Sequence, residues 1–128
     1  MVALSTETRS FLDKNIQSVD ELQVLLFLRS HSDSDWDGLR VAKQLTLKPL
    51  EACNILMRLH LQGLIGHQGH TGRYFHYRYS VHPKIKERRI SELAEAFEKA
   101  RTEIIDYIFA NQQQLNAFAD AFQFRKDD

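Results

Sequence analysis

The run LEACNILMRLHLQGLIGHQGHTGRYFHYRY, from Leu50 to Tyr79, changes halfway from one repeating pattern to another. Its first half repeats apolar residues every three or four positions, which is typical of an amphipathic helix. Gly63 is placed to end that helix, which we expect to reach about Gln62. The second half alternates aromatic with polar residues after a loop that has glycine at both ends, which predicts a β-hairpin.

Two more helices are predicted near the start of the chain. Ser5 is placed to cap a short helix that ends near Lys14. The sequence Ser-Val-Asp-Glu at 18–21 is a capping box, in which the Ser18 hydroxyl and the Glu21 carboxylate each accept a free backbone N–H. The helix that it opens reaches about Arg29 and is apolar nearly all round, so we expect it in the middle of the core.

A third short helix lies between these and the opening run. Asp37 can cap it, and it ends near Gln44. Pro49 then stands at the first position of the following helix, where its missing N–H costs nothing. The short turn between these two helices predicts a helix-turn-helix, and Trp36 is expected to pack as a lid on its core.

The hairpin is expected to have strands near 64–68 and 73–81. Alternation divides its second strand into two faces. We assign to the core the face formed by Phe75, Tyr77, Tyr79 and Val81. A helix-turn-helix followed by such a hairpin is a winged helix-turn-helix, so the predicted fold is mainly α with a small β-hairpin.

A long helix is predicted from Pro83 to about Phe109. Its apolar residues are spaced like those of a coiled coil and form a candidate dimerisation seam: Ile90, Leu93, Phe97, Ala100, Ile104 and Tyr107. At ~1.5 Å per residue this helix is roughly 40 Å long, more than the core of a small domain covers. The simplest partner for the remainder is a second copy of the chain, which predicts a homodimer.

This organisation divides the chain into three parts. Residues 1–82 form the winged helix-turn-helix with its N-terminal helix, 83–110 the long dimerisation helix, and 111–128 a docking tail. The tail repeats apolar residues at helical spacing, including Phe118 to Phe122.

Composition narrows the class of protein. Of the 128 residues, 43% are hydrophobic and 27% charged, which is ordinary for a globular domain. Seventeen basic residues balance seventeen acidic ones, and this neutrality lowers the prior for a nucleic-acid binder. The single cysteine, Cys53, excludes an internal disulfide. The absence of a signal peptide and of a membrane-spanning run favours a cytoplasmic protein.

The layout from Ser18 to Val81 resembles the MarR- and PadR-like winged-helix regulators of bacteria, and the helix after the wing resembles the dimerisation helix of the PadR group. The whole chain is also similar to a group of small bacterial proteins with this fold and no established activity. The features shared with that group are Asn15-Ile16-Gln17-Ser18-Val19, Tyr77-Arg78-Tyr79 and the tail from Phe118 to Lys126. The wider resemblance implies DNA-binding transcriptional regulation as a homodimer.

If the protein binds double-stranded DNA, the helix at 49–62 is the candidate recognition helix. Asn54 and Arg58 are its candidate base readers. The candidate phosphate contacts surround that helix and continue through the wing: Lys48, Arg73, His76, Arg78, Lys84 and Lys86.

A second reading is a winged-helix adaptor that binds a protein and no DNA. The recognition helix carries Leu50, Cys53 and Met57 beside its polar residues, and apolar side chains gain more against a protein than in a polar DNA interface. Either this face or the tail segment Phe118–Phe122 would then contact the partner.

Other kinds of site have little support in the sequence. The histidines of the wing lack the spacing of a zinc site, and the loop at 33–38 lacks the closing glutamate of a calcium loop. There is neither a nucleophile within an acid–base frame nor a phosphate-binding glycine loop. We expect no metal, no cofactor and no enzymatic activity.

Overall fold

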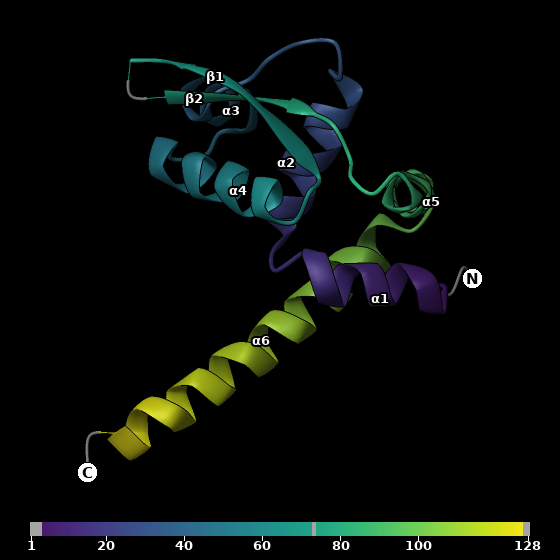
Figure 1. The fold of residues 1–128 in the computed structure, drawn as a ribbon. Helices are drawn as coiled ribbons and strands as arrows, with labels where there is room; N and C mark the ends of the chain where they lie inside the picture. The colour runs from purple at the N-terminus through teal and green to yellow at the C-terminus, as the bar shows by residue number, and fades with distance from the viewer. Residues whose placement is uncertain (1–3, 73, 127–128) are drawn as a thin grey trace.

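The computed structural model describes residues 4–72 and 74–126, and the side chains as far as residue 113. In order along the chain, its elements are α1 (Thr6–Asn15), α2 (Val19–Ser30), α3 (Gly38–Leu45), α4 (Pro49–Leu61), β1 (Ile65–Thr71), β2 (Tyr74–Tyr79), α5 (Ile85–Lys99) and α6 (Arg101–Lys126). The helices α2, α3 and α4 and the hairpin lie together, α1 and α5 lie beside them, and α6 extends away (Figure 1). The predicted fold is confirmed.

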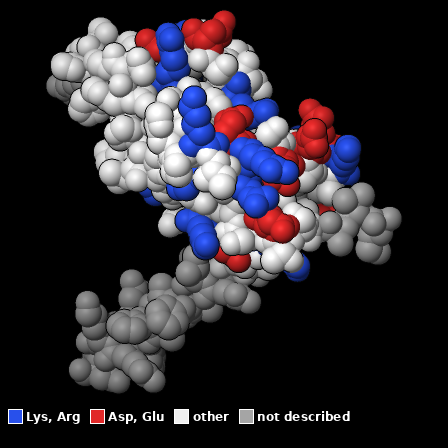
Figure 2. Space-filling view, turned by 45° about the vertical axis from the view of Figure 1, so that its right-hand side comes forward, with Lys and Arg blue, Asp and Glu red and all other residues white. Residues whose placement is uncertain are grey.

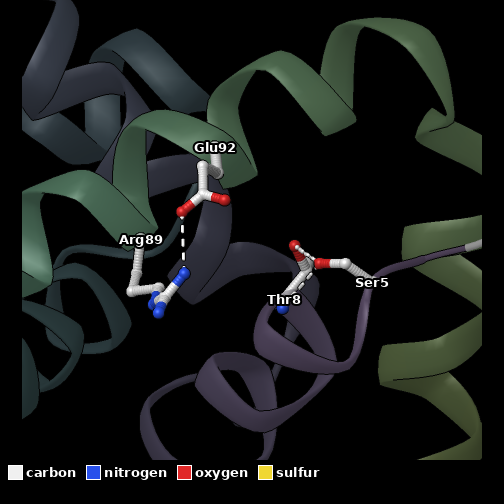
Figure 3. Close-up of polar contacts among 4 residues, drawn as sticks. All are labelled: Ser5, Thr8, Arg89 and Glu92. Atoms are coloured by element: carbon white, nitrogen blue, oxygen red, sulfur yellow. Dashed lines mark hydrogen bonds and ion pairs between the residues drawn. The ribbon is translucent and has the colours of Figure 1, made fainter.

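The predicted caps begin three of the helices. Ser5 Oγ accepts the Thr8 N–H at 3.1 Å at the start of α1 (Figure 3). Ser18 Oγ accepts the Glu21 N–H at 3.2 Å, and Asp37 Oδ1 accepts the Arg40 N–H at 2.8 Å. These contacts satisfy backbone donors that have no partner within the helix.

The other half of the predicted capping box is wrong. The Glu21 side chain is fully buried and forms an ion pair with Arg58. Neither carboxylate oxygen of Glu21 has a hydrogen-bond partner among the described residues. The carboxylate of this residue therefore serves tertiary packing rather than capping.

Gly63 ends α4 and begins the wing. It has φ +78°, in the left-handed region that glycine adopts without strain. Its carbonyl accepts the His82 N–H at 2.7 Å, so the two ends of the hairpin are joined at this residue. A Cβ here would lie 2.5 Å from the His82 carbonyl oxygen. Both the backbone angle and the close approach therefore require glycine.

The wing is a two-stranded antiparallel sheet with a register shift between His67 and Gly69. Trp36 extends it as a single bridge: its N–H and carbonyl exchange 2.7 Å hydrogen bonds with those of Tyr77. Trp36 and Tyr77 are both buried, so the predicted lid position of Trp36 is confirmed.

The assignment of Phe75 to the core was wrong. It is 51% exposed, whereas Tyr77 in the same strand and Val81, just after the strand, are buried. The core ends at the Trp36–Tyr77 bridge, and Phe75 lies beyond it towards the tip, where its ring contacts those of His67 and His70. Alternation predicts the face of a strand but not how far the core extends along it.

The predicted continuous helix from Pro83 to Phe109 was also wrong. The chain leaves helical geometry at Ala100, with φ −135° and ψ 48°, between α5 and α6. No glycine or proline marks this break in the sequence. Ile90 on α5 and Ile104 on α6, on the two sides of this bend, both belong to the same hydrophobic core.

The predicted dimerisation seam is therefore largely covered within one chain. Four of its members are buried in the protomer: Ile90, Leu93, Ala100 and Ile104. Phe97 and Tyr107 are half-buried, and the Tyr107 hydroxyl donates to Asp13 Oδ1 of α1 at 2.8 Å. The buried four are covered without a second copy of the chain.

The boundary predicted at residue 110 is not an element boundary, because α6 runs from Arg101 to Lys126 without interruption. The side chains of the tail segment Phe118–Phe122 lie outside the described part of the chain. None of the helices that the structure describes has both the length and the apolar composition to cross a bilayer.

Candidate nucleic-acid interface

The two faces of α4 are both largely apolar. The inner face packs into the core through Ala52, Ile55, Leu56 and Leu59. The opposite side is a line of exposed residues, here called the α4 outer stripe: Leu50, Asn54, Met57 and Leu61. The exposed fractions of its apolar members are 73% for Leu50, 49% for Met57 and 77% for Leu61. This exposure is unusual because side chains of this kind are commonly buried.

The apolar members of this stripe differ from the predicted apolar face in two residues. Leu61 was missed, although it continues the helical spacing four residues after Met57. Cys53 is turned towards α3, where a Cβ on Gly38 would lie 2.2 Å from its sulfur. Burial and the nearby Asp37 carboxylate raise the pKa of the Cys53 thiol, which disfavours the reactive thiolate.

Arg58, one of the two predicted base readers, forms an ion pair within the protein, although 41% of its side chain is exposed. Its Nη2 lies 3.5 Å from Oε2 of the buried Glu21 carboxylate. Burial raises the pKa of Glu21, and the positive charge of Arg58 acts in the opposite direction. Asn54, the other predicted base reader, lies exposed on the outer stripe.

Two of the predicted phosphate contacts are paired with acidic residues beside Trp36. Arg78 Nε lies 2.7 Å from Asp35 Oδ1, and His76 Nε2 lies 3.9 Å from Asp37 Oδ2. Both pairs follow from the Trp36–Tyr77 bridge, which brings the neighbours of Trp36 opposite those of Tyr77 in antiparallel order. The Arg78–Asp35 pair reduces the positive charge that the wing presents to a polyanion.

The remaining predicted cations differ in their surroundings. Lys86 Nζ donates to the Gln62 carbonyl oxygen at 3.1 Å and so neutralises the carboxyl end of α4. Lys48, immediately before α4, and Lys84, before α5, are exposed. Arg73 lies outside the described residues.

The structure adds Lys43 to the candidates. This residue is exposed in the last turn of α3, in the helix-turn-helix and close in sequence to Lys48. Its place on the polar side of a short amphipathic helix was the signal from which it could have been found. Arg40, one turn earlier, is held over the Trp36 ring with its guanidinium carbon 4.6 Å from the ring centroid.

The distribution of charge agrees with a net charge of zero. On the face drawn in Figure 2, basic and acidic side chains are interspersed rather than gathered into one basic patch. Figure 3 shows one such pair, Arg89 Nη1 and Glu92 Oε1 at 3.0 Å on α5. Within the described residues, no group of three or more His, Cys, Asp or Glu is arranged to hold a metal ion.

The fold defined by these elements is a winged helix-turn-helix, and known structures share it. The crystal structure of the S. aureus MepR–DNA complex matches with a TM-score of 0.57 and 15% identity, over 93% of this chain and 86% of that one. A mutant of MepR from a multidrug-resistant S. aureus clinical isolate matches with a TM-score of 0.55 and 15% identity, over 94% and 87% of the two chains. No protein-family model and no curated protein matches the sequence.

Proposed function

We propose that the protein is a DNA-binding transcriptional regulator that acts as a homodimer and inserts α4 into the major groove. The observation that carries this proposal is the likeness to MepR, which extends over nearly the whole of both chains and includes a structure of that protein with DNA. The exposed Asn54 on α4 is a residue type that reads bases, and the exposed Lys43 and Lys48 are residue types that contact phosphates and flank the turn before α4.

The test is the fluorescence anisotropy of a labelled duplex of random sequence, titrated with the protein at about 50 mM and about 200 mM salt. Release of counterions from several phosphate contacts predicts that the affinity falls by orders of magnitude between the two salt concentrations. No binding at the lower concentration contradicts the proposal.

The surroundings of each basic side chain predict how much it contributes to DNA binding. Lys48→Ala should weaken binding to random duplex and flatten its salt dependence, because Lys48 is exposed beside α4. Arg78→Ala should have a smaller effect, because Asp35 already neutralises that side chain. Lys14→Ala, an exposed cation on α1, is the matched control and should bind like the wild type. A larger loss for Arg78→Ala than for Lys48→Ala would contradict this reading of the interface.

A second candidate function is a protein-interaction adaptor, favoured by the exposed apolar residues of the α4 outer stripe. An adaptor should bind its partner with little dependence on salt and lose it on Met57→Asp. A salt-insensitive complex with a protein, together with no affinity for duplex DNA, would favour this candidate over the regulator.

A further inference from the structure

The α4 outer stripe is exposed but contains no cation. Its members are spaced four, three and four residues apart, so they lie along one line down the helix. Asn54 is the only polar member, and it stands between Leu50 and Met57. A helix laid in the major groove along this line would offer the bases one carboxamide flanked by apolar side chains.

Each base pair presents a different pattern of hydrogen-bonding and apolar groups in the major groove, so each favours different side chains. Guanine presents two acceptors and favours arginine or lysine, whereas adenine presents an acceptor beside a donor and favours asparagine or glutamine. Thymine adds a methyl group that apolar side chains contact. The chemistry of Leu50, Asn54 and Met57 thus matches an A·T pair and lacks the donors that guanine favours.

The other polar residues of α4 lie beside the stripe, and the two that could donate each have a partner within the protein. The Arg58 guanidinium is paired with the buried Glu21, and His60 Nδ1 contacts the Ile65 carbonyl oxygen at 3.1 Å. Glu51 is exposed but lies about 100° around the helix from Leu50, beside the stripe rather than on it. The phosphate-binding candidates Lys43 and Lys48 come before the stripe in the sequence, and the residues of the stripe are themselves exposed.

We propose that the α4 outer stripe selects A·T base pairs, with Asn54 bonded to an adenine and Leu50 and Met57 packed against thymine methyl groups. This inference rests on the proposed DNA-binding function and names the class of sequence that it targets. Considered alone, exposed apolar residues favour a protein partner. In this proposal, Leu50 and Met57 distinguish thymine from cytosine by contacting the thymine methyl group.

The first experiment selects duplexes with a randomised core on the full-length protein. The expected product is enriched in A·T pairs, in two half-sites about one helical turn apart if the protein acts as a dimer. Asn54→Ala should bind the selected duplex about 5- to 150-fold more weakly and lose the preference at one adenine. Lys48→Ala, the control, should weaken binding to all duplexes alike.

The second experiment changes single atoms of the selected DNA. Deoxyuridine in place of thymidine removes the methyl group and should weaken wild-type binding by about fourfold at a contacted position. Leu50→Ala or Met57→Ala should abolish that difference at its own position. Likewise, 7-deazaadenine in place of adenine should weaken DNA binding by the wild type but not by Asn54→Ala. The base modification and the substitution remove the same contact, so their effects are not additive.

The outcomes separate this inference from the proposed function. Salt-dependent binding that selects G·C pairs, selects nothing, or ignores the thymine methyl groups overturns the A·T inference and leaves DNA binding in place. Unchanged selection by Asn54→Ala also overturns it. Failure to bind any duplex at low salt overturns both, and binding of a protein through Met57 would then identify the stripe as an adaptor surface.

Discussion

The Glu21 carboxylate is fully buried where α2 packs against α4, and Arg58 is the cation that balances it. Removing a carboxylate from water raises its pKa, and Arg58 only partly offsets this effect. The pair connects the helix at the centre of the core to the candidate recognition helix. The free energy of unfolding should therefore depend on pH through the ionisation of Glu21.

We expect the free energy of unfolding to depend on the ionisation of Glu21. Because its folded pKa is raised above the ordinary value of 4.5, the folded state holds the proton more tightly than the unfolded one. The contribution of Glu21 is fully present below pH 4.5 and is lost as the pH rises through the raised pKa. Urea unfolding of the wild type and Glu21→Gln from pH 4 upward should show this loss in the wild type alone. Parallel curves for the two proteins would contradict the prediction.

At the scale of elements, the sequence predicted the helix caps and the turn that single residues determine. The caps at Ser18 and Asp37 and the turn at Gly63 were found because each rests on one residue with a special bonding or backbone capacity. The break at Ala100 was not predictable in this way, because no local signal marks it and the shared core imposes it. The same holds for the site: the spacing predicted the exposed Leu50 and Met57 on α4, but the burial of Glu21 and the pairing of Arg58 depend on tertiary packing.

The contact between α3 and α4 gives a prediction at this scale. Gly38→Ala should lower the free energy of unfolding by about 1–3 kcal/mol, because the added Cβ would lie 2.2 Å from the Cys53 sulfur. Gly38→Ala combined with Cys53→Ala should regain part of the loss, since the substitution on α4 removes the sulfur. The remaining cost comes from the Cys53 backbone, whose Cα would lie 3.2 Å away. Additive effects in a double-mutant cycle of thermal unfolding would show that the two residues do not interact.

At the scale of the whole molecule, the proposed homodimer depends on apolar surface that a single chain leaves exposed. Helix α6 extends away from the other elements (Figure 1), and Phe109 on it is 50% exposed. Four residues of the originally predicted seam are already buried, so the proposed contact moves towards the exposed part of α6.

We therefore predict a dimer that is sensitive to substitution on α6. Phe109→Asp should shift the protein from dimer to monomer, because a carboxylate there would be buried without a partner. Asp106→Asn, at an exposed position on the same helix, is the control and should leave the dimer unchanged. Light scattering coupled to gel filtration measures the mass directly. A wild-type monomer, or a dimer unaffected by Phe109→Asp, would contradict the prediction.

In the proposed complex, α4 is the surface that contacts DNA. The most direct measurement is the change in backbone amide chemical shifts when a duplex is added to isotopically labelled protein at low salt. We expect the largest changes on residues 50–61 of α4 and on Lys43 and Lys48, and little change on α1. Changes concentrated on α1, α5 or α6, or no changes at all, would contradict it.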